Sequence, residues 1–558
     1  MSANRYLAEA LKAAGTTHYF HVPVSIPGAL KEMSRLGVTP VMTHGEKAAA
    51  YMADGFARVS GRPGVCGAQI IGATNLAAGL RDAYMARIPV VAITGGTRPD
   101  WQYRLQYQEI DDRLVYDSVT KFNVNVWGPE RLPDLLVSAF RAATTGAPQP
   151  VHLELSGIGG EVALAGNVRA DPAALKDYSR YPSMRPAAEQ DSVASAGAAL
   201  SAAVRPVMVV GGGAKSSGAR AEVVALAQRL QMPVALGLNA KGTYPERDPL
   251  YLGIVGEYSS EAANRAVCEA DLVFYVGSQT GGMITRSWSV PPIESRVIHL
   301  DIDPQNIGRN YPDTLALCGD ARTVLRQLLA VVEGVVDRRS WLARTEELKV
   351  AWSTRISATE GSEAIPLLPQ RLAREISNAL PADAILVGDT GHTGAWLAQN
   401  VHATHDEQTF IRAHGSLGWA FPASIGAKCA APDRTVICFT GDGGMYYHLS
   451  ELETAVRYGI NVVVVVNNNS SYSQEQPLWE GKEEYEKNWK LVSADFVAVA
   501  EAFGCLGRRV ENPDDIGEAL TWAVEARQPV VLDVRSEMSA LSIPSWDSSG
   551  SSGMYDIA

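Results

Sequence analysis

The sequence predicts an α/β protein of three domains built on parallel sheets. Short β-branched runs alternate with alanine-rich helical stretches along nearly the whole chain, a pattern typical of parallel sheets covered by helices. At 558 residues the chain is too long for one hydrophobic core. Two polar stretches, at about 160–190 and 336–364, interrupt the pattern and mark the expected domain boundaries.

We expect the first domain to span residues 1–165, the second 190–335 and the third 360–540. The second begins at "RPVMVVGGGAKSSGAR", a strand followed by a glycine turn, and is expected to be Rossmann-like. The serine- and glycine-rich tail, residues 541–558, is expected to be flexible, either as a mobile flap or as a disordered end.

The composition limits the partners of the protein. Basic residues number 49 against 61 acidic ones, the net charge is −12, and no long basic run occurs, which argues against nucleic acid. No apolar run approaches the roughly 20 residues that span a bilayer, and "MSANRYLAEALKAAG" predicts an amphipathic helix rather than a signal peptide. Six scattered cysteines suit a reducing compartment. We therefore expect a soluble, cytoplasmic protein with no membrane partner.

Two neighbouring strands carry the clearest chemical signal. "TVICFT" (435–440) predicts a buried strand, and the following "GDGG" predicts a tight turn around Asp442. "NVVVVV" predicts the next buried strand, with Asn469 just beyond its carboxyl end, so both side chains are expected on one rim of the sheet. Such oxygen ligands suit Mg²⁺, which takes phosphate oxygens as further ligands. Taken singly, Asp442 is better explained as a turn former and Asn469 as a strand end.

This pattern resembles the GDG-(x)n-NN signature of thiamine diphosphate-dependent enzymes. The resemblance implies an α/β fold in which two thiamine diphosphate-binding domains flank the central Rossmann-like domain. It also implies a Mg²⁺ ion held by the side chains of Asp442 and Asn469 and the backbone carbonyl of Ser471, bridging the cofactor diphosphate. The glycines that it places against the cofactor are Gly441, Gly443 and Gly444.

"THGEKAAAYMADGFARVSG" (43–61) resembles the helix that carries the family's activating glutamate, which would be Glu46. Thiamine becomes a nucleophile only when its C2 proton is lost, and the cofactor's own aminopyrimidine acts as the base. The resemblance implies that the Glu46 carboxyl shares a proton with the pyrimidine ring. Without that context, Glu46 is a helix-start glutamate favoured by the helix dipole.

Two further segments resemble parts of the cofactor site. "GDTGHTGAWLAQ" resembles the glycine-rich segment that contacts the diphosphate, which implies contacts from Gly391, His392 and Thr393. His392 and Thr393 replace the usual glutamine and histidine there. "HGSLGWAFPASIGA" resembles the segment whose apolar residue, here Leu417, props the cofactor in a bent conformation; core packing is the plain alternative for a leucine.

Substrate-facing residues are implied by segments that resemble acetohydroxyacid synthases. "GATNLAAGLRDA" and "YQEID" place Thr74, Asn75 and Gln108 near the pyrimidine and the substrate, although "IIG" replaces the family's usual "GPG" before the threonine. Further acid–base candidates are His21, His44, His414 and the segment 469–481. Most lone histidines are ordinary surface or core residues, so this alternative stays open for each.

The middle domain resembles one that binds FAD, ADP or part of CoA in relatives. The matching pieces include "VVGGGAKSSG", "ADLVFYVGSQTGG" and "HLDIDPQNIGRN". "GSQTGG" stands where FAD-binding members carry an arginine followed by acidic residues. FAD or ADP is therefore a candidate ligand, and a nucleotide-free domain is the open alternative.

The leading functional hypothesis is a thiamine diphosphate- and Mg²⁺-dependent lyase or carboligase, acetolactate synthase-like, acting on a 2-oxo acid, an α-diketone or a 2-hydroxyacyl compound. "PVSIPG" replaces the "PGG" of acetohydroxyacid synthases, and their substrate-selecting tryptophan and arginine have no counterpart after Asn469, which argues against a biosynthetic acetohydroxyacid synthase. The alternatives are a flavin-dependent 2-oxo acid oxidase, a 2-hydroxyacyl-CoA lyase or oxalyl-CoA decarboxylase-type enzyme, and a non-catalytic subunit. Glu46 argues against the last.

The resemblance also implies an oligomer. In this family the cofactor lies between the first domain of one subunit and the third domain of another, so a homodimer or homotetramer is expected. The remaining partner would be a small carbonyl substrate.

Overall fold

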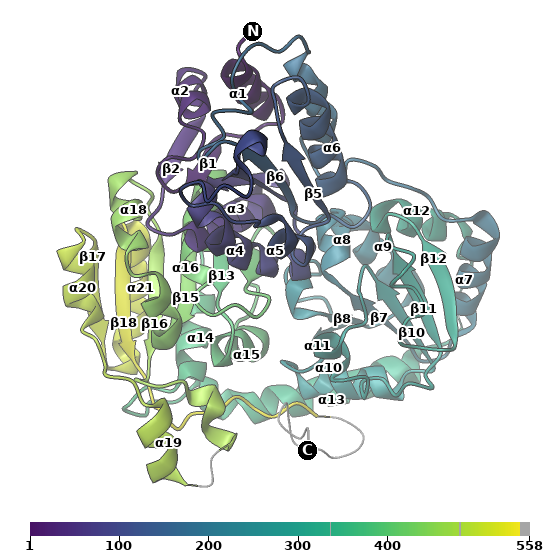
Figure 1. Cartoon of the computed structure of the whole chain (residues 1–558). Helices are drawn as coiled ribbons and strands as arrows, with labels where there is room; N and C mark the ends of the chain where they lie inside the picture. The colour runs from purple at the N-terminus through teal and green to yellow at the C-terminus, as the bar shows by residue number, and fades with distance from the viewer. Residues whose placement is uncertain (335, 479–480, 547–558) are drawn as a thin grey trace.

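The computed structural model describes residues 1–334, 336–478 and 481–546, and in it the chain forms three six-stranded sheets (Figure 1). All neighbouring strands in these sheets run parallel. Buried hydrophobic clusters cover both faces of each sheet, as helices on both sides require. The predicted α/β fold with three parallel sheets is confirmed.

The first and third sheets have the same topology. Numbered from its own first strand, each sheet has the spatial order 2-1-3-4-6-5. The chain therefore contains two units of the same topology. The first sheet consists, in spatial order, of β2 (Thr39–Met42), β1 (His18–His21), β3 (Gly64–Ala68), β4 (Val90–Gly96), β6 (Val151–Ser156) and β5 (Phe122–Val126). The third consists of β14 (Thr409–Arg412), β13 (Ile385–Gly388), β15 (Val436–Gly441), β16 (Val463–Asn468), β18 (Val530–Arg535) and β17 (Leu506–Val510).

The middle sheet has the strand order of a Rossmann fold. Numbered from its first strand, the order is 3-2-1-4-5-6, which confirms the predicted Rossmann-like centre. The strands in this order are β9 (Tyr251–Ile254), β8 (Val234–Leu236), β7 (Pro206–Val210), β10 (Leu272–Val276), β11 (Val297–Asp301) and β12 (Thr314–Cys318).

Helices connect the strands of each sheet and cover its faces. Those of the first domain are α1 (Ala3–Ala13), α2 (Pro27–Arg35), α3 (Glu46–Ser60), α4 (Ala73–Ala86), α5 (Arg113–Asp117) and α6 (Leu132–Thr144). Those of the middle domain are α7 (Gln190–Ala202), α8 (Gly212–Ser216), α9 (Arg220–Leu230), α10 (Glu261–Glu269), α11 (Gly282–Thr285) and α12 (Ala321–Val331). Those of the third domain are α14 (Pro369–Ala379), α15 (His392–Gln399), α16 (Ala420–Ala430), α17 (Asp442–Met445), α18 (Glu451–Arg457), α19 (Lys482–Trp489), α20 (Phe496–Ala502) and α21 (Ile516–Glu525).

Two segments tie the middle domain to the third. Helix α13 (Arg339–Glu360) runs along the bottom of the view in Figure 1 and buries Trp341 against the middle sheet, where its Nε1–H donates to the carbonyl of Pro206. Residues 541–546 cross back to the middle domain, and the hydroxyl of Ser545 donates to the carbonyl of Gly256. The rest of the expected flexible tail, residues 547–558, lies outside the described residues.

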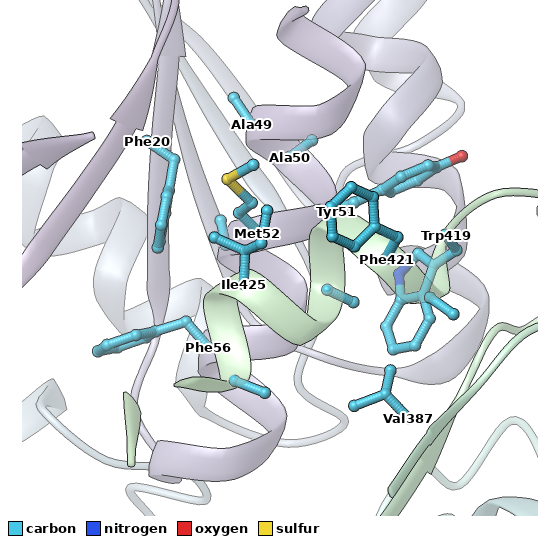
Figure 2. Close-up of a cluster of buried hydrophobic side chains, with 14 of the residues drawn as sticks. Phe20, Ala49, Ala50, Tyr51, Met52, Phe56, Val387, Trp419, Phe421 and Ile425 are labelled. Carbon is cyan, nitrogen blue, oxygen red and sulfur yellow. The ribbon is translucent and has the colours of Figure 1, made fainter. Parts of the chain in front are cut away.

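A close helix crossing joins the first and third domains. Helices α3 and α16 pack in one hydrophobic cluster that draws side chains from both domains, and Figure 2 shows Met52 of α3 beside Ile425 of α16. Two glycines permit this approach. A Cβ atom at Gly55 would lie 2.1 Å from the carbonyl oxygen of Ala423, and one at Gly426 would lie 1.8 Å from that of Met52. The two domains therefore share a core rather than merely touching.

Replacing Gly55 with Ala is expected to destabilise the protein by about 1–3 kcal/mol or more, because the added methyl group would meet backbone and force the helices apart. The thermal unfolding midpoint measures the effect. Gly517→Ala in α21 is the control, since its Cβ would meet only the end of the Glu375 side chain at 3.9 Å. We expect that change to be neutral or to stabilise by up to about 1 kcal/mol. Equal midpoints for the two variants would contradict the close crossing.

Candidate active site

The third sheet gathers three polar segments at one edge. Strands β13, β15 and β16 are neighbours in the sheet. Gly391, Asp442 and Asn469 follow their carboxyl ends. Between β13 and β15, the direction in which successive strands are added to the sheet reverses. Ligands of open α/β sheets bind in the crevice at such a reversal.

The oxygens of Asp442 and Asn469 converge on one backbone group. The Asp442 Oδ2 and the Asn469 Oδ1 both accept hydrogen bonds from the N–H of Ser471, each at 3.2 Å. The Asp442 Oδ1 accepts from the N–H of Gly443 at 2.8 Å. The predicted tight turn is corrected here: β15 ends at Gly441, which is the N-cap of α17, so Asp442 is a first-turn helix residue. That geometry points its carboxylate toward the end of β16.

The chemistry of these donors fits a hard divalent cation. Asp442 and Asn469 are buried, with 3% and 7% of their surface exposed, and burial raises the pKa of Asp442 to about 6 against opposing backbone donors. A carboxylate, a carboxamide and the nearby carbonyl of Ser471 are the oxygen ligands that Mg²⁺ accepts. Among the described residues, no group of three or more His, Cys, Asp or Glu side chains is placed to hold a metal. A metal in this crevice would therefore be bound by the mixed set of carboxylate, carboxamide and backbone carbonyl oxygens.

The glycines of the motif make room around Asp442. A Cβ at Gly443 would lie 2.4 Å from the ring of Tyr472, and one at Gly444 would lie 2.7 Å from the carboxylate of Asp389. A Cβ at Gly441 would lie 3.8 Å from the Oγ1 of Thr393, so that residue lines the same crevice. Side chains at these glycines would fill the space beside the carboxylate.

The amino end of α15 faces this crevice. Gly391, with φ of 73°, is its N-cap, and His392 and Thr393 form its first turn. The first turn of a helix offers backbone N–H groups and a positive dipole end, which favour a phosphate. Burial lowers the pKa of His392 to about 4, and its Nδ1 lies 3.3 Å from the Oγ of Ser473. His392 is therefore neutral at neutral pH and contributes polarity rather than charge.

Leu417 lies in the turn between β14 and α16. The next residue, Gly418, has φ of 77° and donates its N–H to the Oδ1 of Asp389 at 3.2 Å. The Oδ2 of Asp389 accepts from the Thr440 hydroxyl at 2.8 Å, just before the Asp442 motif. Sequence reasoning missed Asp389 as a site residue, although "GDTG" follows β13 as "GDGG" follows β15. That repeated strand–Gly–Asp pattern was the available signal.

One cavity of about 660 Å³ extends from this edge to the middle domain. Leu417, Gly391 and His414 line its third-domain side. Its far wall is the crevice between β7 and β10, where the Rossmann strand order reverses. Two glycines of the triplet that follows β7 permit a close approach there, because a Cβ would lie 2.3 Å from the carbonyl oxygen of Gly277 at Gly211 and 2.9 Å from it at Gly213.

His414 faces the middle domain within this cavity. Its Nδ1 lies 2.8 Å from the amide nitrogen of Asn239, and its backbone N–H donates to both carboxylate oxygens of Asp82 at 2.9 Å. Burial and the neighbouring Arg412 lower the pKa of His414 to about 4. The ring is neutral at neutral pH.

Glu46 lies in a separate group of residues in the first domain. It is the first residue of α3, and its Oε2 accepts a hydrogen bond from Asn75 at 3.3 Å. A Cβ at Gly72 would lie 2.3 Å from the Glu46 Oε1, so the glycine admits the carboxylate. Thr74 donates to the carboxylate of Asp112 at 2.5 Å. The amino ends of α3 and α4 thus meet around Glu46.

The other first-domain candidates lie in the same domain, and in the described part of the chain no hydrogen bond joins them to Glu46. His21 ends β1, is 6% exposed, and places its Nδ1 3.0 Å from the carbonyl of Val22, while burial lowers its pKa. Gln108 lies in the loop between β4 and α5 with φ of 65°, and its Oε1 is buried without a hydrogen-bond partner. His44 pairs instead with Glu453, at 2.7 Å. Glu46, His21, Thr74, Asn75 and Gln108 are absent from the lining of the large cavity.

Comparison with known proteins identifies the family. Residues 1–114 match the thiamine pyrophosphate enzyme N-terminal TPP binding domain, 193–328 the central domain, and 389–534 the C-terminal TPP binding domain. The chain is 34% identical over 510 residues to a probable acetolactate synthase large subunit of Methanocaldococcus jannaschii, which covers 88% of this chain and 85% of the relative. The chain belongs to the family of thiamine diphosphate-dependent enzymes. Its TPP-binding domains imply that thiamine diphosphate is its cofactor.

Other relatives have similar or less specific names. The acetolactate synthase isozyme 2 large subunit of Escherichia coli is 30% identical over 542 residues, which are 96% of this chain and 95% of the relative. The putative thiamine pyrophosphate-containing protein YdaP of Bacillus subtilis is 29% identical over 538 residues, 96% of this chain and 91% of the relative. This thiamine diphosphate enzyme is thus similar to acetolactate synthase large subunits along its length. In the part of the chain that is described, no helix is long and apolar enough to cross a membrane.

A buried histidine behind the Glu46 group makes stability depend on pH. His152 is fully buried, its ring stacks on Tyr116 with centroids 3.5 Å apart, and the Tyr116 hydroxyl donates to the carbonyl of Ala73 at the start of α4. Burial lowers the pKa of His152 from 6.5 to about 3. The unfolded chain therefore binds a proton that the folded protein does not between these values, and stability falls as the pH falls below 6.5.

From this group alone we expect the free energy of unfolding to drop by about 2 kcal/mol between pH 8 and pH 5. In His152→Gln that part of the pH dependence should disappear. Denaturant unfolding at the two pH values measures it, and His405→Gln, at an exposed position, is the control. A pH dependence unchanged by His152→Gln would contradict the burial of a neutral ring.

Proposed function

We propose that the protein is a thiamine diphosphate- and Mg²⁺-dependent lyase or carboligase, acetolactate synthase-like, that cleaves or forms a C–C bond next to a carbonyl. A 2-oxo acid, an α-diketone or a 2-hydroxyacyl compound would be the substrate. One observation carries the proposal: the oxygens of Asp442 and Asn469 converge on the N–H of Ser471 at the crevice of the third sheet. Family membership supplies the cofactor whose diphosphate a cation there would hold.

Each part of this crevice has a task in the proposal. Asp442, Asn469 and the Ser471 carbonyl would hold Mg²⁺, and the first turn of α15 with Gly391 would receive the diphosphate oxygens. When bound, thiamine diphosphate supplies the nucleophilic carbon that attacks a carbonyl and the ring that accepts the electron pair of the breaking C–C bond. Leu417, which lines the cavity, would orient the cofactor by contact.

Glu46 would hold a proton at its carboxylate. Asn75 donates to the Oε2 and so fixes the orientation of the carboxyl group, while Gly72 leaves its Oε1 uncrowded by a side chain. The direct acid–base contacts with substrate remain assigned to His21, Gln108 and His414. The unpartnered Oε1 of Gln108 supports this for Gln108.

The active unit in this proposal is a homodimer or a homotetramer of such dimers. Glu46 does not line the cavity that Leu417 and Gly391 line, which favours a site completed by a second subunit. The loop before α5 also exposes large apolar side chains that a second subunit would cover. These are Trp101, Tyr103, Leu105, Tyr107 and Ile110.

Glu46→Gln is expected to lower turnover by about 10²-fold or more while thiamine diphosphate still binds, because the amide cannot share a proton in the same way. Purified protein is assayed with candidate carbonyl substrates, with and without thiamine diphosphate and Mg²⁺, by following aldehyde release or 2-oxo acid loss. Glu501→Gln, at an exposed position on α20, is the matched control. Turnover without added cofactor in stripped protein, or full activity of Glu46→Gln, would refute the proposal.

Subunit complementation tests the shared site. Glu46→Gln and Asp442→Asn chains, each inactive alone, are co-expressed with different tags and the mixed dimers are isolated. If the site lies between subunits, the isolated mixed dimers should show about half of wild-type activity, because each carries one intact site of two. No recovery in isolated mixed dimers would contradict the shared site.

A second candidate is a flavin-dependent 2-oxo acid oxidase, or an enzyme of the 2-hydroxyacyl-CoA lyase or oxalyl-CoA decarboxylase type that uses CoA substrates. The cavity at the reversal of the Rossmann strand order favours a nucleotide-containing ligand such as FAD, ADP or CoA. The protein is denatured and removed, and the absorbance spectrum of the remaining supernatant distinguishes a released flavin from an adenine nucleotide. A yellow protein whose flavin is bleached by substrate would favour the oxidase, and a colourless active preparation would exclude it.

A further inference from the structure

A buried charge network connects the first domain to the turn that carries Leu417. Arg58 of α3 donates from its Nε and Nη2 to the two oxygens of Asp54, at 2.8 and 2.7 Å. Its Nη2 also donates to the Oδ1 of Asp82 on α4, at 3.0 Å. Neither carboxylate side chain is exposed. A buried trio of this kind persists only if further donors satisfy the excess negative charge.

The further donors come from the third domain. The N–H groups of His414 and Ser416 donate to Asp82, at 2.9 and 3.2 Å. The Nε1–H of Trp419 donates to Asp54 at 2.9 Å, and the Arg58 guanidinium lies 4.4 Å from the centre of the Trp419 ring. The carboxylates of the first domain are thus satisfied by the backbone and indole of the third.

Leu417 is held on both sides by this arrangement. Asp82 accepts from the N–H groups of His414 and Ser416 before Leu417, and Asp389 accepts from the N–H of Gly418 directly after it. A carboxylate that accepts two backbone N–H groups fixes a turn much as an N-cap fixes a helix end. Gly415 lies open within this turn, with φ of 123° and no atom within 4 Å of the place of a Cβ.

We infer that Asp82 is a positioning residue for the candidate site, which fixes the turn 414–416 and thereby places Leu417 against the cavity. The expected effect of Asp82 on cofactor binding rests on the proposed function. Its effect on the turn rests on geometry alone. Arg58 supplies the countercharge that keeps Asp82 buried. The same two helices carry Glu46 and Asn75 at their amino ends. In the proposed dimer, α3 and α4 would therefore serve two sites, one at each of their ends.

The test compares Asp82→Asn with Asp54→Asn. Both remove one buried charge beside Arg58, but only Asp82 accepts from the backbone of the turn. Hydrogen–deuterium exchange of the peptide covering 412–419 is measured in cofactor-free protein. The dissociation constant of thiamine diphosphate with Mg²⁺ is measured by calorimetry, and the thermal midpoint is recorded for each variant.

We expect Asp82→Asn to speed exchange at His414 and Ser416 and to weaken thiamine diphosphate binding by about tenfold or more, because one oxygen acceptor becomes an amide donor. Asp54→Asn is expected to lower the thermal midpoint similarly but to leave both quantities within about threefold of wild type. Equal exchange or equal binding in the two variants would overturn the inference.

If Asp82→Asn does not fold, Asp82→Glu, which keeps the charge and lengthens the side chain, replaces it with the same expectations. Failure of the wild type to bind thiamine diphosphate would instead refute the proposed function, while the exchange data would still decide the role of Asp82 in the turn.

Discussion

The close crossing of α3 and α16 is the contact on which the arrangement of the first and third domains depends. Their backbones approach at Gly55 and Gly426, where any side chain would meet a carbonyl oxygen. The helices and the facing sides of two sheets then bury one continuous hydrophobic cluster. Burial of this kind is favourable in proportion to apolar area, so the two domains gain stability only in this mutual position. The turn that carries Leu417 leads directly into α16.

The chain uses the same structural device three times. In each sheet the strand order reverses next to its first strand, which is where open α/β sheets bind ligands. The first sheet places His21 at this edge, the middle sheet its glycine triplet, and the third sheet Gly391 and Asp442. Parallel sheets bury both faces, so their strand ends are the natural place for polar side chains to reach a ligand.

Buried carboxylates around the site are each satisfied by backbone N–H groups. Asp442 accepts from Gly443 and Ser471, while Asp389 accepts from Gly418 and from the Thr440 hydroxyl. Such bonds oppose the rise in pKa that burial causes, and they also fix the loops that donate them. The site is therefore built from acids that order the polypeptide, and in the proposed function Asp442 would also present oxygen to a cation.

Several features follow from the sequence because they are local. Alternating strands and helices predict parallel sheets, and a carboxylate or amide just after an apolar run marks a strand end, as at Asp442 and Asn469. The helix that begins at Glu46 is likewise predicted from the sequence, because its alanines and other small residues form a continuous helical pattern. The prediction of a tight turn at Gly441–Gly444 was wrong for a local reason as well. Glycines favour turns, but here strand β15 ends at Gly441 and helix α17 begins at the next residue.

Only the tertiary structure decided which of these features meet. Asp82 finds its partners 332 and 334 positions away, and hydrophobic patterning reports that a residue is buried, not against what. The common topology of the first and third sheets, the cavity shared by the domains, and the grouping of Glu46 with Asn75 rather than with Asp442 are long-range facts of the same kind. The sequence determined the chemistry of each segment. The packing of α3 against α16 decided how those segments face one another.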